Sequence, residues 1–287
     1  MDQKSADELQ EHMLGTYHGL RIGLVVIGFA LPIVLFLAGI ALHGAGLEPS
    51  ISRYYYTVDR VRFLTTRDLF VGGLLAAASC LYLYKGYSTR ENVALNLAGV
   101  FALGVALLPT AEHKGNGGLI PTLHNTSAVL FFLCIAYVSV FRSRDTLRLL
   151  PAERRARYAQ LYLWTGLAMV LSPLAALGVS YLLEPTSRPR TLVFWIESFG
   201  VWAFAAYWYF KTREMGESSA EEGALDAKLE RRVVPTTSPD QPGATSGASG
   251  AILRTLTPES GNVERIVPAP PAPPPQPPAP PPPPASR

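Results

Sequence analysis

The sequence has little charge and few cysteines, and it contains none of the short motifs that mark common catalytic sites. Only 16% of its 287 residues are charged, against about 25% in an average soluble domain. Cys80 and Cys134 are its two cysteines. Both fall inside apolar segments, so we expect them to pack as small hydrophobic residues rather than to form a disulfide framework or a metal site. No CxxC pair, histidine-rich tract or GxxxxGKS/T sequence is present. The composition therefore predicts no metal and no cofactor.

The balance of charge does not indicate a nucleic-acid partner either. The net charge at pH 7 is +3, and the basic residues are divided among several polar stretches instead of forming one stripe. Proteins that bind DNA or RNA gather a basic patch on one face. The chain is therefore not expected to bind nucleic acid.

Six segments are long, apolar and almost free of charge. Because an α-helix rises about 1.5 Å per residue, about 20 apolar residues span the hydrocarbon core of a bilayer. We therefore predict an all-α fold, a polytopic transmembrane bundle of six helices with a disordered, proline-rich C-terminal tail. Pro32 and Pro173 lie inside two of the helices and should kink them. The expected helices cover residues 20–42, 68–84, 93–108, 123–141, 161–183 and 192–210.

The segments on either side of the expected bundle (residues 20–213) differ from it and from each other. Residues 1–19 are polar, lack the basic start of a secretory signal, and are expected to be a cytoplasmic N-terminal segment. Residues 214–287 are rich in Ser, Gly, Glu and Ala and end in the proline tract Pro268 to Pro284. Such a composition cannot bury enough apolar surface to fold. We expect a disordered cytoplasmic tail whose last part is extended polyproline II, a spacer or a ligand for a cytoplasmic partner.

Local patterns support these helix assignments. Thr65 to Asp68 and Ser88 to Glu91 have the S/T-x-x-D/E form of a helix capping box. Asp68 is therefore interpreted as a helix-terminal anion in preference to a catalytic acid. The third expected helix carries small residues at a spacing of four, which predicts a face for close helix packing and no activity. These residues are Ala94, Ala98, Ala102 and Ala106.

The loop between the first two expected helices contains three consecutive tyrosines, Tyr54, Tyr55 and Tyr56, next to Arg53. Tyrosine rings are apolar and their hydroxyls prefer water, so one interpretation places this run at the membrane interface. The other interpretation is that the loop folds over the helix ends and lines a pocket. The sequence leaves both open.

The distribution of basic residues predicts how the bundle is oriented. Loops rich in Lys and Arg stay in the cytoplasm. With six helices, the two termini share a side with the second and fourth loops, and six arginines lie between residues 142 and 157. Both termini are therefore expected to be cytoplasmic. We expect a mixture of acidic, imidazole and hydroxyl groups on the outer side, and no comparable mixture on the cytoplasmic side.

Glu197 lies inside the sixth expected helix. A carboxylate in lipid costs roughly 3 kcal/mol on insertion scales, so Glu197 is expected to face protein or water, with Arg67 or His124 as its partner. Such a pair would either lock the helices together or form part of an outward-facing polar pocket. The candidate pocket consists of Ser52, Tyr54, Tyr55, Tyr56, Arg67, Asp68, His124, Ser127, Trp195 and Glu197.

Two motifs carry a resemblance to a known family. The runs Ser50-Ile51-Ser52-x-Tyr54-Tyr55-Tyr56-Thr57 and Arg67-Asp68-x-Phe70-Val71-Gly72 resemble the S-I-S-x-Y-Y-Y-T and R-D-x-F-V-G signature of an uncharacterised bacterial family of six-helix integral membrane proteins. The resemblance covers most of residues 20–210, including the Trp195-x-Glu197 pair, and excludes the tail. It implies a multi-pass protein of the bacterial plasma (inner) membrane and supplies no activity.

Three functions fit these observations. The first is a non-enzymatic membrane protein that binds or moves a small molecule or a lipid through an outward-facing pocket. The second is a membrane-embedded, metal-dependent hydrolase that uses Asp68, His113, His124 and Glu197, loosely similar to membrane ceramidase-like hydrolases. No HxxxH or HxxE pair supports such a metal site. The third is a scaffold that recruits a partner through its tail. The residues favour a protein without enzymatic activity but do not decide the question, and membrane lipids are expected partners in every case.

Overall fold

The computed structural model describes residues 3–43, 47–57, 64–111, 118–182 and 191–218. The chain divides into two units, residues 1–235 and 236–287, and every described residue belongs to the first. The predicted disordered tail lies, from residue 219 onward, outside the described residues. His113, which the hydrolase hypothesis uses, also lies outside them.

All regular elements in the described residues are helical, which confirms the predicted all-α fold. Each of the six expected segments overlaps one long helix: the second and third run one residue past the helix end, the fourth continues into η2, and residue 183 of the fifth lies outside the described residues. Of the short elements, η1 is a 3-10 helix and η2 is a π-helical turn. The elements are α1 (Gln3–His43), η1 (Ile51–Tyr55), α2 (Thr66–Leu83), α3 (Thr89–Leu107), α4 (Leu119–Tyr137), η2 (Val138–Arg142), α5 (Arg144–Leu147), α6 (Ala152–Leu182) and α7 (Leu192–Ser218).

Several helices are long and apolar enough to cross a membrane. Five segments meet this criterion among the described residues, so the chain has the multi-pass helical architecture that the sequence predicts. The long helix α7 is not one of the five; it contains Glu197 and several Trp and Tyr residues, which lower its mean hydropathy. The five are Glu11–Ala41, Thr66–Leu83, Thr89–Leu107, Leu119–Leu147 and Ala152–Ser180.

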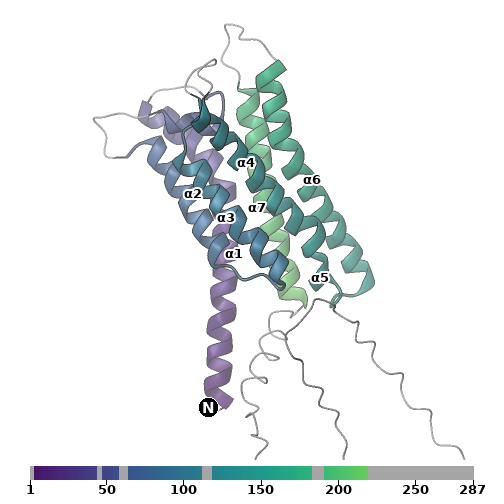
Figure 1. Cartoon of the computed structure of the whole chain (residues 1–287). Coiled ribbons are helices and arrows are strands. Elements are labelled where there is room, and N and C mark those ends of the chain that lie inside the picture. Colours follow the sequence, from purple (N-terminus) through teal and green to yellow (C-terminus); the bar gives the residue numbers. More distant parts are fainter. Residues whose placement is uncertain (1–2, 44–46, 58–63, 112–117, 183–190, 219–287) are drawn as a thin grey trace, which may run out of the picture. The chain divides into compact units, whose positions relative to one another are not determined.

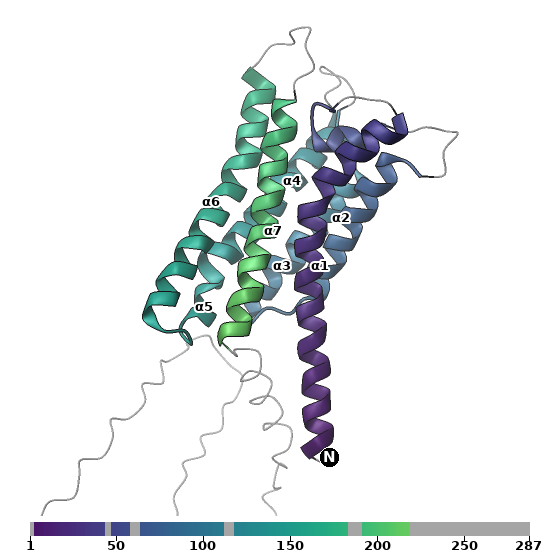
Figure 2. The ribbon, with the colours of Figure 1, turned by 180° about the vertical axis from the view of Figure 1, so that it is seen from behind.

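The six long helices pack side by side in a closed ring. Each helix contacts the next along the chain, in the order α1, α2, α3, α4, α6 and α7, and α7 returns to pack against α1 (Figures 1 and 2). The predicted packing face of α3 is buried: Ala98, Ala102 and Ala106 are each at most 1% exposed. A Cβ placed on Gly99 would lie 3.0 Å from the carbonyl oxygen of Ala78 on α2. Small residues therefore set the close approach of these two helices.

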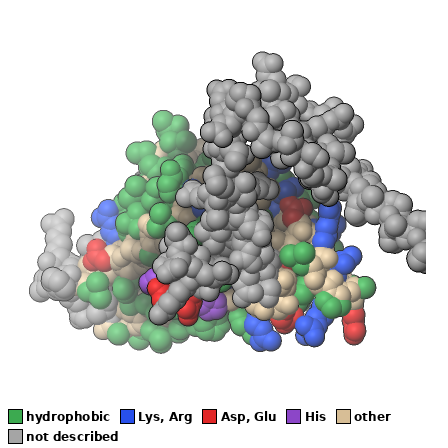
Figure 3. Space-filling view, turned by 90° about the horizontal axis from the view of Figure 1, so that it is seen from below, with side chains coloured by type: hydrophobic (Ala, Val, Ile, Leu, Met, Phe, Trp, Pro, Cys, Tyr) green, Lys and Arg blue, Asp and Glu red, His purple; other side chains and the backbone are tan. Residues whose placement is uncertain are grey.

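Large apolar side chains also cover the outside of the bundle. Val26 and Phe29 on α1 are 58% and 59% exposed, and Leu107, Leu171 and Phe199 on three other helices are similarly open. So many exposed apolar residues on all sides would be a liability in water and suit a surface that faces lipid. Figure 3, which views the molecule from the end where α1 begins, shows Lys and Arg side chains at the edge of this end.

The helix ends follow the local patterns in the sequence. At the start of α2, the Thr65 side chain accepts a hydrogen bond from the backbone N–H of Asp68, and Asp68 accepts from the backbone N–H of Thr65. The predicted capping box and the structural role of Asp68 are thus confirmed. At α3, Ser88 accepts from the backbone N–H of Glu91, but the Glu91 carboxylate accepts from Tyr87 instead.

Each of the two prolines within helices lies beside a side-chain hydrogen bond between its helix and α7. Figure 2 shows α1 bending in its C-terminal part, where Pro32 removes a backbone hydrogen bond. In the adjoining turn, the indole N–H of Trp202 on α7 donates to the carbonyl oxygen of Phe29, at 3.2 Å. In α6, the residue before Pro173, Ser172, donates to the carbonyl oxygen of Ile196 on α7, at 2.6 Å.

The boundary between the bundle and the tail was predicted too early. The helix α7 continues to Ser218, and Glu214 and Met215 are 0% and 3% exposed. Residues 214–218, assigned to the tail from their composition, belong to the last turns of α7. The physical reason is a buried ion pair between Glu214 and Lys211, which a composition average does not register.

Candidate functional site

The tyrosine loop folds over one end of the helix ring. Ile51 and Tyr54 in η1 are 4% and 0% exposed. The Tyr54 ring lies against Gly39 on α1, where an added Cβ would come within 2.8 Å of it, and stacks edge-on against Phe194 on α7. Burial raises the pKa of the Tyr54 hydroxyl above its usual value. Of the two interpretations that the sequence left open, the structure confirms that this loop lines a pocket.

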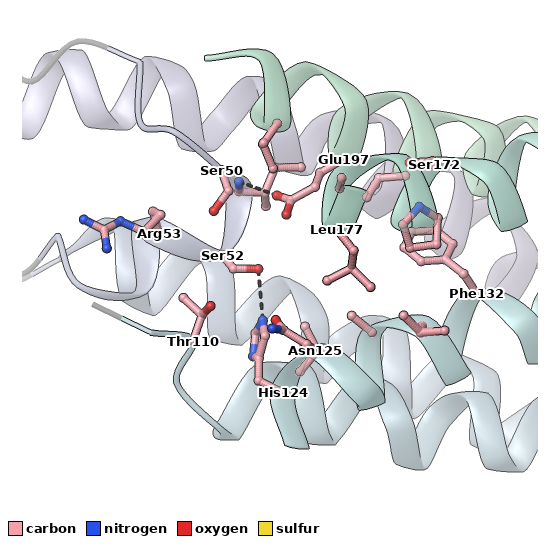
Figure 4. Close-up of a pocket in the computed structure, with 18 of the residues that line it drawn as sticks. Ser50, Ser52, Arg53, Thr110, His124, Asn125, Phe132, Ser172, Leu177 and Glu197 are labelled. Atoms are coloured by element: carbon pink, nitrogen blue, oxygen red, sulfur yellow. Dashed lines mark hydrogen bonds between the residues drawn. The ribbon is translucent and has the colours of Figure 1, made fainter. Parts of the chain in front are cut away.

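Beneath η1 lies a cavity of about 610 Å³. Figure 4 shows it between α7 on one side and α4 on the opposite side, with α6 alongside. Helix α7 packs on α1 and α6, and α4 packs on α3 and α6; α4 and α7 meet through the rings of Phe131 and Phe204, and the cavity lies between them toward η1. Polar groups gather at the η1 end, and the deeper walls are mainly apolar. The polar lining residues are Ser50, Ser52, Arg53, Thr110, His124, Asn125, Ser172, Ser180 and Glu197.

Glu197 does not form the ion pair expected from the sequence. Its carboxylate accepts a hydrogen bond from the backbone N–H of Ile51, at 2.7 Å. The side chain of the N-cap residue, Ser50, makes no capping hydrogen bond with any described residue, so a carboxylate from α7 satisfies the first turn of η1 in its place. The predicted pairing with Arg67 or His124 is wrong, because the free N–H groups of a short helix supplied the partner.

His124 is held by two hydrogen bonds and is 2% exposed. Its Nδ1 lies 2.6 Å from the carbonyl oxygen of Leu108, and its Nε2 lies 3.1 Å from Oγ of Ser52. A carbonyl can only accept, so Nδ1 carries the hydrogen. The Nε2 lone pair of the neutral ring is therefore directed at Ser52, and the Ser52 hydroxyl donates to it. Figure 4 shows this contact at the edge of the cavity.

Of the ten predicted site residues, the structure brings Ser52, His124 and Glu197 together around the cavity. Two other predicted residues pair with each other elsewhere. The Arg67 guanidinium lies 4.3 Å from the centre of the Tyr55 ring and donates to its hydroxyl at 2.7 Å. Neither of them lines the cavity.

The remaining predicted residues have structural contacts outside the cavity. The Tyr56 hydroxyl donates to the carbonyl oxygen of Thr110, which ties the tyrosine loop to the end of α3. Ser127 faces α3, where a Cβ on Gly104 would lie 2.5 Å from its Oγ. Trp195 is 50% exposed and stacks on Phe194 and Trp202. Tyr54 and Asp68, described above, belong to the core and to the α2 cap.

Sequence reasoning missed several residues that line the cavity. Asn125 directly follows His124, and Arg53 directly follows Ser52, so proximity in sequence could have suggested both. Arg53 donates from Nη1 to the carbonyl oxygen of Ala111, at 3.2 Å. Ser172 and Pro173 lie in the middle of α6 and line the cavity. Their place beside α7 depends on how the helices pack, which a sequence pattern does not show.

The opposite end of the bundle holds a buried cluster of an ammonium, a carboxylate and two hydroxyls that the sequence did not indicate. Nζ of Lys211 lies 2.8 Å from the Glu214 carboxylate, and their side chains are 1% and 0% exposed. The Lys211 ammonium also donates to Oγ1 of Thr146, at 2.7 Å, and the Tyr162 hydroxyl donates to Glu214, at 2.8 Å. This cluster connects α5, α6 and α7. Helical spacing alone did not show that these side chains turn inward.

The described residues contain no group of three or more His, Cys, Asp and Glu side chains that could hold a metal ion. In particular, Asp68 is committed to its cap and does not line the cavity with His124 and Glu197. The chemistry available at the cavity is that of a serine, an imidazole, a carboxylate and a guanidinium above apolar walls.

Comparison of the chain with models of known protein families, with curated proteins and with solved structures gives no significant match. The geometry of the cavity is therefore the basis for any statement about function.

Proposed function

We propose that this chain is a multi-pass membrane protein whose cavity binds a lipid-like molecule, with the polar end of the ligand at η1 and its apolar chain between α4, α6 and α7. The observation that carries the proposal is the cavity of about 610 Å³ with polar groups at one end and mainly apolar walls below. Ligand pockets of about 300–1,000 Å³ enclose small organic molecules.

The division of the walls supports an amphipathic ligand over a wholly polar one. The deeper lining includes Phe131, Phe132, Leu177 and Val201, and none of these side chains can satisfy a buried polar group. Leaving such a group without a hydrogen bond costs several kcal/mol in an apolar environment, whereas an acyl chain gains about 0.8 kcal/mol per buried CH₂.

The polar end offers both donors and acceptors. The Asn125 side chain makes no hydrogen bond with any residue that the structure describes, and Figure 4 shows it beside the His124 ring. Arg53 lies at the same end, but its guanidinium points away from Ser52 and His124 and donates to the carbonyl oxygen of Ala111. A ligand headgroup with carbonyl or other oxygen acceptors is suited to the Asn125 amide.

We further propose that α7 is a sixth span and that both termini are cytoplasmic, which places the η1 end of the cavity toward the outer face. The support is the excess of Lys and Arg at the opposite end of the bundle. Assignment to a bacterial inner membrane, and to the six-helix family that the sequence resembles, belongs to the same proposal. Its support is the pair of motifs around Ser52 and Asp68.

The test of the binding proposal is the identification of lipids that copurify with the full-length protein in detergent. We expect one lipid class to be enriched over the bulk membrane, at about one molecule per chain. A copurified lipid profile identical to that of the membrane would contradict the proposal.

A further inference from the structure

The contact between Ser52 and His124 has the form of an activated nucleophile. Nucleophilic serines are recognised by a base within about 2.6–3.2 Å of Oγ and by a third group that orients the base. Here the Oγ–Nε2 distance is 3.1 Å, and the carbonyl oxygen of Leu108, 2.6 Å from Nδ1, is the orienting group. Because this carbonyl fixes the hydrogen on Nδ1, the basic nitrogen faces the serine.

The three participants come from separate parts of the fold. Ser52 is on η1, His124 is in the second turn of α4, and Leu108 ends α3. Glu197 on α7 holds the first turn of η1 through the N–H of Ile51, the residue before Ser52. The turn that carries the serine is therefore anchored on the side of the cavity opposite His124, as Figure 4 shows.

Access distinguishes this pair from an ordinary core hydrogen bond. Ser52 and His124 both line the cavity of about 610 Å³, and Ser52 is half-buried. A carbonyl carbon near Oγ would have close by the Asn125 amide, which makes no hydrogen bond with any described residue, and the apolar walls would be available for its chain. Stabilisation of an oxyanion by an asparagine side chain is a known device of acyl-transfer enzymes.

We propose that Ser52 is a catalytic nucleophile, with His124 as its general base, in the hydrolysis of an acyl ester whose chain occupies the cavity. This activity rests on the proposed function, because the ester must be part of a molecule that the cavity binds. It differs from a metal-dependent hydrolase, since the nucleophile is a side-chain oxygen.

The reaction balances in two steps. In the first, Oγ of Ser52 bonds to the ester carbonyl carbon, and its proton moves to Nε2 of His124. The tetrahedral intermediate then breaks the bond to the leaving oxygen, which takes this proton and departs as an alcohol. In the second, a water molecule attacks the acyl-serine ester and gives a proton to His124. The acid leaves, and the proton returns to Ser52. No oxidant or reductant is needed.

The experiment uses an alkyl fluorophosphonate, which forms a covalent bond with activated serines, on the full-length protein in detergent. We expect one adduct per chain, located on Ser52 by peptide mass spectrometry. In His124→Gln, the labelling rate should fall at least about 100-fold, the usual contribution of a general base. The matched control is Ser79→Ala, because Ser79 is an exposed serine on α2 that does not line the cavity; its labelling rate should equal that of the wild type.

The labelling of the wild-type protein can refute the proposal by itself, so the test does not depend on the variants folding. Absence of an adduct on Ser52 at saturating probe, or equal labelling rates in wild type and His124→Gln, would refute the activity. A protein that retains an enriched lipid but is not labelled would leave the binding function standing and the hydrolysis refuted. A labelled protein without any enriched lipid would instead contradict the proposed lipid binding.

Discussion

Glu197 is a half-buried carboxylate whose partner is a backbone amide. A charge in an apolar setting needs compensation, and the N–H groups at the start of a short helix are donors that nothing else satisfies. The 2.7 Å contact with the N–H of Ile51 meets both needs. The carboxylate therefore stabilises a loop, and through that loop it places Ser52 at the cavity.

The first prediction concerns the sign of the effect of removing this carboxylate. Glu197→Leu keeps the size of the side chain and removes the acceptor, so it should lower stability by about 1–3 kcal/mol. Glu197→Gln keeps one oxygen acceptor, so its stability should lie between those of the wild type and Glu197→Leu. The measurement is thermal unfolding of the purified protein in detergent, with the fluorophosphonate labelling rate of Ser52 as a second readout.

Glu11→Leu is the control for Glu197→Leu, because Glu11 is an exposed acid on α1 that does not line the cavity. Its unfolding temperature and labelling rate should hardly change. If Glu197→Leu were instead more stable than the wild type, the carboxylate would be an uncompensated charge, and its capping role would be disproved.

At this scale, the sequence indicated that Glu197 and His124 matter but not what they contact. Ionisable residues within apolar segments are conspicuous, and so both were found. The partner of Glu197, the N–H of Ile51, and one of the two partners of His124, the carbonyl oxygen of Leu108, are backbone groups, and every residue has those. No side-chain pattern could therefore identify them.

Among the elements, α7 carries charged side chains on its interior face near both of its ends. It contributes Glu197 near its first turn and the Lys211–Glu214 pair near its last turns. The segment was easy to find as an apolar run, but its end at Ser218 was not. In the sequence, Lys211 and Glu214 resemble the polar residues that follow a membrane-spanning segment. Their burial depends on α5 and α6, which supply Thr146 and Tyr162.

The second prediction tests this buried pair. Lys211→Met leaves the Glu214 carboxylate, 0% exposed, without its cation, and breaking a buried pair costs about 3–5 kcal/mol. We therefore expect a large loss of thermal stability. Arg213→Met replaces an exposed arginine on the same helix turn and should change the thermal stability little. The double variant Lys211→Met/Glu214→Met should recover part of the loss, since no lone charge remains.

Thermal unfolding of the four proteins in one detergent provides the comparison. Equal unfolding temperatures for Lys211→Met and Arg213→Met would show that the pair is solvated and does not hold α7 to its neighbours.

As a whole molecule, the described bundle is a ring of six helices with an apolar outside and a covered, partly polar cavity at one end. The class of fold could be predicted because six long apolar runs have no other stable arrangement in a membrane. The ring order and the cavity could not. They depend on how α4 and α7 pack toward η1, and this follows from side-chain shape at many positions rather than from any one motif.

The third prediction tests the proposed orientation. In a background with Cys80→Ala and Cys134→Ala, a single cysteine is introduced at an exposed position at either end of the bundle, by Gly118→Cys or Arg148→Cys. A membrane-impermeant maleimide added to intact cells should label the Gly118→Cys variant and not the Arg148→Cys variant. Both should react after the membrane is permeabilised. The reverse pattern would place the termini and the basic end outside.

The central claim is that the cavity holds a lipid-like molecule, and neighbouring alanines on α6 allow a direct test. Ala176 lines the cavity and is 7% exposed, whereas Ala175 is exposed on the outside of the helix. Ala176→Trp should fill part of the cavity, and Ala175→Trp adds the same side chain to the lipid-facing surface. The measurement is the amount of the enriched lipid that copurifies per chain. The account predicts that wild type and Ala175→Trp retain it, and that Ala176→Trp loses at least about tenfold, equivalent to about 1.4 kcal/mol of binding free energy. Equal amounts of lipid in all three proteins would contradict it.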